Sequence, residues 1–218
     1  MYKYGSRAAW LAAVAASLGV AWAAFGAVDN GIGIVFLPEY KGAIGIQTNR
    51  ERELRFEEDV FAGETVKTGP GGATALQFLD ETRIQIGANS TVVLDEFVFD
   101  PNAGLQQATL NFGTGIFRII SNGSGADQRL KLRTPTASLA IRGTKFMLEV
   151  KPDGGTVVGI LEGEVTAFPC GGEAAGAQAG HSLIVDASCT GTKVVSGNAT
   201  SSTDPAVTSD IPIATDGP

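Results

Sequence analysis

Arg129-Leu130-Lys131-Leu132-Arg133 is the stretch of this 218-residue sequence that decides its fold class. Its leucines alternate with basic residues, so an extended backbone places the leucines on one face and the charges on the other. The same alternation occurs in residues 82–86 and 145–150. Alternation of this kind is typical of a β-strand that has one face against a core and one face in water.

Similar short segments follow one another from Gly33 onward, and turn-forming residues separate them. The chain holds 29 glycines and 9 prolines, which reverse or interrupt an extended backbone. We therefore predict an all-β fold, either a twisted β-sandwich or a short β-solenoid-like stack of short strands. Further strands are expected over residues 64–68, 73–79, 91–98, 105–112, 115–120, 156–161, 164–168 and 182–186.

Residues 1–27 have the order of a secretory signal peptide, in which positive charge precedes an apolar run. Lys3 and Arg7 precede an uncharged, alanine-rich stretch from Ala8 to Val28. We expect one apolar signal helix that is cleaved on export, with an uncleaved membrane anchor as the alternative. In both cases the remaining chain is expected outside the cytoplasm, periplasmic or secreted, with membrane contact only through this segment if it stays uncleaved.

Composition divides the rest of the chain into three parts. Residues 28–59 are expected to hold N-terminal strands and a charged loop, and residues 60–195 to form the main β domain. Residues 196–218 lose nearly all large apolar side chains and collect Ser, Thr, Asp and Pro. Such a segment cannot bury enough surface to offset its chain entropy, so we expect it to be disordered.

Cys170 and Cys189 are the chain's two cysteines. Thiols in an oxidising compartment tend to pair, so we predict a disulfide between them. A zinc site is the alternative, but His181 is the sole histidine and such a site would need further ligands. We expect a structural disulfide, with no metal and no other cofactor.

The sequence argues against nucleic-acid binding and against catalysis. A net charge of −7, with the basic residues scattered along the chain, makes nucleic acid a poor partner. Asp95 and Glu96 are neighbours on one predicted strand, so alternation should turn them to opposite faces and prevent a glycosidase-type pair. His181 has no identifiable nucleophile and acid for a hydrolase triad. We therefore expect a non-enzymatic protein.

Two groups of basic residues are candidates for a partner surface. The first is Arg50, Arg52 and Arg55, in a densely charged stretch that reads most simply as a solvated loop or an edge strand. The second is the basic strand face of Arg129, Lys131 and Arg133. Both could present charge to another molecule.

Arg142 lies in the largely apolar stretch Ile141–Thr144. We expect it to be partly buried, with its guanidinium bonded to backbone carbonyls or paired with Asp95 or Glu96. This predicts a structural clamp; the alternative is a ligand contact.

A series of short blocks, taken in order, resembles the FecR domain family over roughly residues 60–167. The blocks are GETVKTGPGG (63–72), ALQFLDET (75–82), IGANS (86–90), LDEFVFDP (94–101), LNFG (110–113), GIFR (115–118), RTPTA (133–137), IRGT (141–144) and GILEGEV (159–165). The resemblance implies an extracytoplasmic β-rich module, similar to the periplasmic part of transmembrane regulators that relay iron-uptake signals to a sigma factor. Those regulators carry a long cytoplasmic anti-sigma segment, whereas seven residues precede the apolar run here, so we do not expect that route of contact.

These observations lead us to expect an exported, FecR-type binding or signalling module of the cell envelope. Its partner would be an envelope protein or a surface polymer. The alternative is a structural or spacer component of the envelope or cell surface.

Overall fold

The protein is described by a computed structural model over residues 31–36, 42–121 and 129–200. Within these ranges the chain forms strands and no helix, so the predicted all-β class is confirmed. In chain order the strands are β1 (Gly33–Val35), β2 (Ala43–Gln47), β3 (Arg50–Glu53), β4 (Asp59–Val60), β5 (Glu64–Thr68), β6 (Thr74–Phe78), β7 (Arg83–Ile86), β8 (Thr91–Asp100), β9 (Gly104–Phe112), β10 (Gly115–Ile120), β11 (Leu130–Arg133), β12 (Ala137–Val150), β13 (Thr156–Pro169), β14 (Ala175–Gln178), β15 (His181–Val185) and β16 (Thr192–Ser196).

The predicted signal helix of residues 1–27 lies outside the described residues. In the part of the chain that the structure covers, there is no helix that could cross a membrane.

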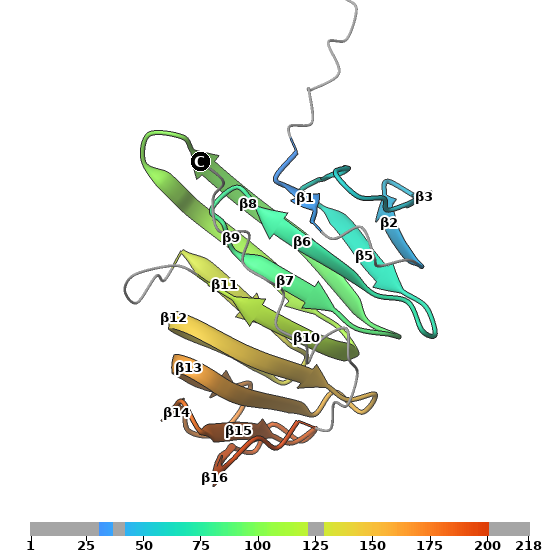
Figure 1. The fold of residues 1–218 in the computed structure, drawn as a ribbon. Helices are drawn as coiled ribbons and strands as arrows, with labels where there is room; N and C mark the ends of the chain where they lie inside the picture. The colour runs from blue at the N-terminus through green and yellow to red at the C-terminus, as the bar shows by residue number, and fades with distance from the viewer. Residues whose placement is uncertain (1–30, 37–41, 122–128, 201–218) are drawn as a thin grey trace, which may run out of the picture.

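All sixteen strands belong to one sheet, which curls back on itself into two layers (Figure 1). One layer has the order β3-β2-β5-β8-β9-β11, the other has the order β10-β7-β6-β1-β4, and β12 joins them. The finer prediction of a sandwich or a solenoid-like stack is therefore replaced by a single curled sheet with two facing layers.

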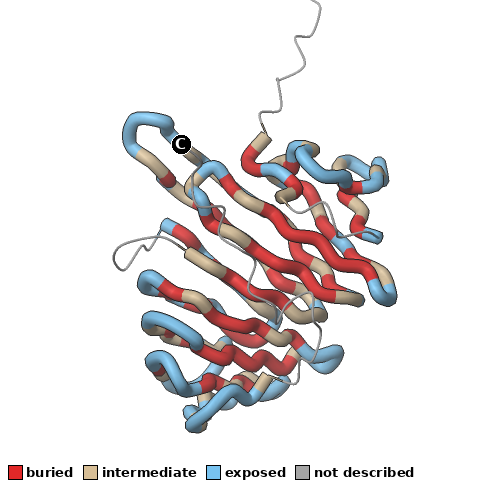
Figure 2. Tube along the Cα trace, viewed as in Figure 1, coloured by how far each residue is buried: buried red, intermediate tan, exposed pale blue. Residues whose placement is uncertain are grey.

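Aromatic side chains meet between the two layers. Phe78 on β6 stacks on Phe97 of β8 with ring centroids 5.4 Å apart, and Phe112 on β9 meets Phe117 of β10 edge-on at 4.8 Å. The buried positions run along the middle of the strands, while the turns at their ends are exposed (Figure 2). One hydrophobic core thus fills the space that the curled sheet encloses.

The long hairpin of β12 and β13 is shared by both layers. The first half of β12 pairs with β11, and its second half, from Lys145 to Val150, pairs with β10. Between the halves, the register with β13 shifts at Arg142 and Lys145. Gly143 has φ 54° and Gly163, opposite on β13, has φ 78°. These left-handed conformations favour glycine and let both strands bend while their pairing continues.

Two hydroxyl groups fix the corners where the chain passes between the layers. Thr68, at the end of β5, donates to the Gly87 carbonyl at 2.6 Å and accepts from the Ser90 amide at 2.9 Å. Ser90 in turn accepts from the Ile116 amide at 3.1 Å. The corner after β7 is therefore tied both to β5 and to β10.

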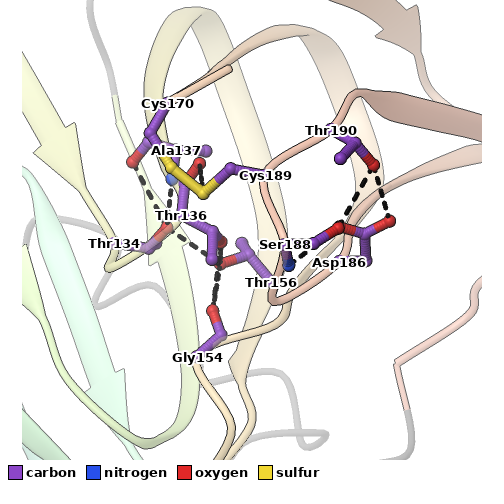
Figure 3. The surroundings of a disulfide bond; sticks show 10 residues. All are labelled: Thr134, Thr136, Ala137, Gly154, Thr156, Cys170, Asp186, Ser188, Cys189 and Thr190. Carbon is purple, nitrogen blue, oxygen red and sulfur yellow. Dashed lines mark hydrogen bonds between the residues drawn. A yellow bond between two sulfur atoms is a disulfide. The ribbon is translucent and has the colours of Figure 1, made fainter. Parts of the chain in front are cut away.

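The C-terminal strands extend the sheet beyond β13, and a disulfide joins them to it. The predicted Cys170–Cys189 bond is confirmed, with the two Cα atoms 5.4 Å apart. Both cysteines adjoin the turn before β12, where the Cys170 amide donates to the Thr136 carbonyl at 2.9 Å (Figure 3). Below this contact, Thr156 donates to Thr134 at 2.8 Å and lies 2.8 Å from the Thr136 hydroxyl.

The ordered chain extends further than the sequence suggested. The segment expected to be disordered begins at Ser196, but Ser196 is the last residue of β16, and residues 197–200 continue in described structure. Residues 201–218 lie outside the described residues.

Replacing both cysteines by serine should lower the free energy of unfolding by about 3 kcal/mol, because the bond closes a loop between cysteines that are 19 positions apart in the sequence. Urea denaturation of the oxidised protein and of the Cys170→Ser/Cys189→Ser variant measures the difference. Reductant should reproduce the loss in the natural protein and leave the variant unchanged. An unchanged midpoint in both cases would contradict a stabilising bond.

Gly163→Ala should cost more stability than an alanine with the same positive φ would cost at an open position. A Cβ at Gly163 would overlap the Gly143 carbonyl oxygen and lie 2.7 Å from the Arg142 carbonyl oxygen. Gly104 is a matched control, because its φ is 76° and a Cβ there meets nothing within 4 Å. We expect a loss of about 1–2 kcal/mol for Gly104→Ala and about 3–4 kcal/mol for Gly163→Ala. Equal losses in thermal unfolding would show that the close backbone approach is unimportant.

Candidate functional site

Three cations project from the outward face of β11 and β12. Lys131 and Arg133 are exposed, while Leu130 and Leu132 between them are buried, as the alternation predicted. On β12, Arg142 is exposed and its neighbour Ile141 is buried. We call Lys131, Arg133 and Arg142 the basic face. Arg129, just before β11, is exposed beside it.

The residues between these cations are small. Arg133 lies opposite Ser138 on β12, and Ser138 lies opposite Phe168 on β13. Ser138 and Ala140 are exposed together with Arg142 on the outward side of β12. The surface beside the cations therefore consists of short side chains, which leave room for the backbone of an extended ligand.

The cations of the basic face have no partners among the described residues. No ion pair or side-chain hydrogen bond joins Lys131, Arg133 or Arg142 to another group in that part of the chain. Their charges are thus available to a ligand.

The acidic band on β8, which β9 separates from β11, is already engaged. Asp95 accepts a hydrogen bond from the Asn111 side-chain amide at 3.1 Å, and Glu96 accepts one from the Gln107 amide at 2.6 Å. Both amides are on the outward side of β9, so the two carboxylates share that side, and the prediction that they face opposite ways is wrong. The cause is a β-bulge between Leu94 and Glu96, which interrupts the alternation.

Arg142 is not the clamp that the sequence suggested. It is exposed, it makes no bond to Asp95 or Glu96, and its cross-strand neighbour is Glu164. The regular alternation of β12 explains the error, because Leu139 and Ile141 point into the core and the next residue, Arg142, therefore points outward. Arg142 lines a shallow recess of about 450 Å³ with Gly163, Glu164, Gln178 and Ala179. This position fits the alternative role of a ligand contact.

The arginine that does act as a clamp is Arg52 on β3. Its Nε donates to Glu64 Oε1 at 3.0 Å, its Nη2 donates to Glu64 Oε2 at 3.1 Å, and its Nη1 donates to Glu58 at 3.1 Å. Glu64 is fully buried, and it also accepts a hydrogen bond from the Phe61 amide at 3.1 Å. Because a buried carboxylate needs a charge partner, Arg52 is committed to the fold.

Arg50, Arg52 and Arg55 therefore do not form one free basic surface. Arg52 is engaged with Glu64, and Arg55 pairs with Glu53 at 3.1 Å on the exposed surface. Arg50 is exposed at the start of β3, which is the edge strand that one interpretation of this charged stretch predicted. In the second candidate surface, Lys131 and Arg133 of β11 have no partner in the described structure, and Arg142 of the neighbouring strand lies on the same side.

A family model described as FecR protein matches residues 64–166. We call these matched residues the FecR domain. No curated protein matches the chain significantly. Two crystal structures of a candidate anti-sigma factor from Parabacteroides distasonis ATCC 8503 are similar, each with a TM-score of 0.49, at 13% and 14% sequence identity. Each likeness covers 62% of this chain and 60% of the solved one.

The FecR domain contains the whole basic face but not the elements that fasten its flanks. Its match begins at the buried Glu64 and ends within β13, so it includes the hairpin kink at Gly143 and Gly163. Arg52 lies before the matched residues, and both cysteines lie after them. Strands outside the FecR domain are thus tied to it by an ion pair on one side and a disulfide on the other.

Arg52→Met should lower the free energy of unfolding by about 2–3 kcal/mol, because it leaves the Glu64 carboxylate buried without its charge partner. Arg55→Met is the control, and its exposed pair should contribute less than about 0.5 kcal/mol. Chemical denaturation of both variants gives the comparison. Adding Glu64→Gln to Arg52→Met should recover part of the loss, and similar losses in the two single variants would argue against the clamp.

Proposed function

We propose that this protein is an exported, non-enzymatic FecR-type binding and signalling module of the cell envelope, whose contact surface is the basic face. The observation that carries the proposal is the set of unpaired cations on β11 and β12, in a chain whose net charge is −7. Most of the acidic chain repels anions, whereas this surface attracts them. Its partner is an anionic segment of an envelope protein or of a surface polymer.

The spacing of the cations supports an extended ligand. Lys131 and Arg133 are two residues apart on one strand, which separates their Cα atoms by about 6.5–7 Å. Carboxylates on alternate residues of an extended peptide have the same repeat. Arg142, on the neighbouring strand, adds a third contact beside this line, and the low surface at Ser138 and Ala140 lets a backbone approach.

Two further observations support an extracytoplasmic, non-catalytic role. The signal-like N-terminal sequence and the disulfide both suit an oxidising compartment. The paired carboxylates Asp95 and Glu96 are held by side-chain amides of β9, an arrangement that fixes surface side chains. The FecR domain itself belongs to a family of regulatory modules, which favours signalling.

The test compares two full-chain variants with the same change in net charge. Lys131→Gln/Arg133→Gln/Arg142→Gln removes the basic face, and Arg50→Gln/Lys67→Gln/Lys193→Gln removes three exposed cations elsewhere. Binding to a polyglutamate peptide and to alginate is measured by fluorescence anisotropy or calorimetry at low and physiological salt. These probes separate a protein-like from a polysaccharide-like partner.

We expect the basic-face variant to bind the preferred probe about tenfold more weakly, with a smaller salt dependence, while the control variant binds like the natural protein. Equal weakening in both variants would mean that net charge alone is responsible, and the basic face would lose its assigned role. Absence of binding to either probe by the natural protein would favour a structural or spacer role.

A further inference from the structure

The C-terminal residues 201–218 are acidic. They contain Asp204, Asp210 and Asp216 and have no lysine, arginine or histidine. Their charge is therefore complementary to that of the basic face.

The chain enters this segment from the outward side of the sheet. Ser182 donates to the Gly197 carbonyl at 2.7 Å and accepts from the Ala199 amide at 2.9 Å, which holds the chain on β15. A Cβ built on Gly159 of β13 would overlap Asn198 Oδ1 and lie 3.5 Å from Thr200 Cγ2. Since Val158 and Ile160 on either side of Gly159 point into the core, Thr200 lies on the outward surface.

The basic face is within reach of this exit point. β13 pairs with β12, and β12 pairs with β11, so β13 and β11 are about 10 Å apart across the sheet. Along β13, Gly159 is five residues from Glu164, the cross-strand neighbour of Arg142, which is about 17 Å. An extended chain spans about 33 Å between Thr200 and Asp210. Arg142 is therefore within reach of Asp210. Arg133 is level with Phe168, nine residues or about 30 Å along β13 from Gly159, and is within reach of Asp216, for which the span from Thr200 is about 53 Å.

We propose that residues 201–218 dock on the basic face, with the carboxylates of Asp210 and Asp216 beside Lys131, Arg133 and Arg142. This proposal rests on the proposed function for the choice of binding surface. It adds that the chain's own acidic segment occupies that surface. Because the segment is tethered, its effective concentration at the face is high, on the order of millimolar. An external anionic partner must displace it, so the segment sets a threshold for binding.

Zero-length cross-linking of the full chain tests the contact directly. A water-soluble carbodiimide joins an aspartate carboxyl to a lysine amine with loss of water, which hydrates the carbodiimide to a urea. We expect amide bonds from Asp210 or Asp216 to Lys131, identified by mass spectrometry, at least severalfold more often than to Lys67 on β5. High salt should reduce them. Cross-links spread equally over Lys131 and Lys67, or none to Lys131, would overturn the docking.

A competition measurement gives a second, independent readout. Asp204→Asn/Asp210→Asn/Asp216→Asn should bind the polyglutamate peptide severalfold more tightly than the natural chain, because the face is then unoccupied. Unchanged affinity would count against docking while leaving the basic face as a binding surface. If no chain binds the peptide or alginate, the proposed function fails, and the cross-links alone decide whether the acidic segment occupies the face.

Discussion

The close approach of Gly163 to the backbone at Gly143 is the constraint on which the rest of the structure depends. Both residues have positive φ, and a side chain on Gly163 would occupy the space of the opposite carbonyl. The kink lets β12 pair with β11 before it and with β10 after it. Two layers can then share one hairpin and enclose a single core, without a break in the sheet. Arg142 follows the regular alternation of β12 and directly precedes the kink, so the basic face ends where the strand bends.

The flanks of the FecR domain extend this sheet by two different physical means. On the N-terminal side, β2 pairs with β5, and the buried carboxylate of Glu64 fixes β3 through Arg52. On the C-terminal side, β14 and β15 pair with β13, and the disulfide joins the loop after β13 to the loop between β15 and β16, beside the turn before β12. The added strand β3 carries alternating charge at the sheet edge, which discourages pairing with another chain. The domain is thereby lengthened while one of its edges stays protected.

Much of the fold was predictable, because alternation reports directly which face of a strand is buried. The strands 64–68 and 115–120 have their predicted bounds, and Leu130 and Leu132 are buried as expected. The long strands β12 and β13 were missed because their glycines were interpreted as ends of strands, whereas paired bulges let both strands continue. Glu96 was misplaced for the same reason, because the bulge after Leu94 turns it to the outward side with Asp95. Arg142 was misplaced because its apolar neighbours were interpreted as a sign of burial, whereas alternation turns it outward.

The site was harder to predict, because a sequence does not show which charges are already paired. Arg52 and Arg133 have similar surroundings in the sequence, with charged or polar neighbours at alternate positions. Only the fold brings Arg52 against Glu64, from twelve positions away in the chain, and leaves Arg133 without a partner in the described structure. The available signal was the alternation of β5, which places Glu64 on the same face as Val66, since a carboxylate on a buried face requires a nearby cation.

The order of groups across the outward face explains how an acidic chain can keep a basic surface. The carboxylates of β8 are bonded to the amides of β9, and β11 lies beyond β9, so these acids and the cations of β11 are two strand spacings apart. That separation of about 10 Å is close to the screening length at physiological salt, so the two bands interact weakly. The surrounding negative charge still repels anions at long range. A ligand therefore gains little from general attraction and binds only when its charges match the positions of these cations, which favours selectivity over rapid capture.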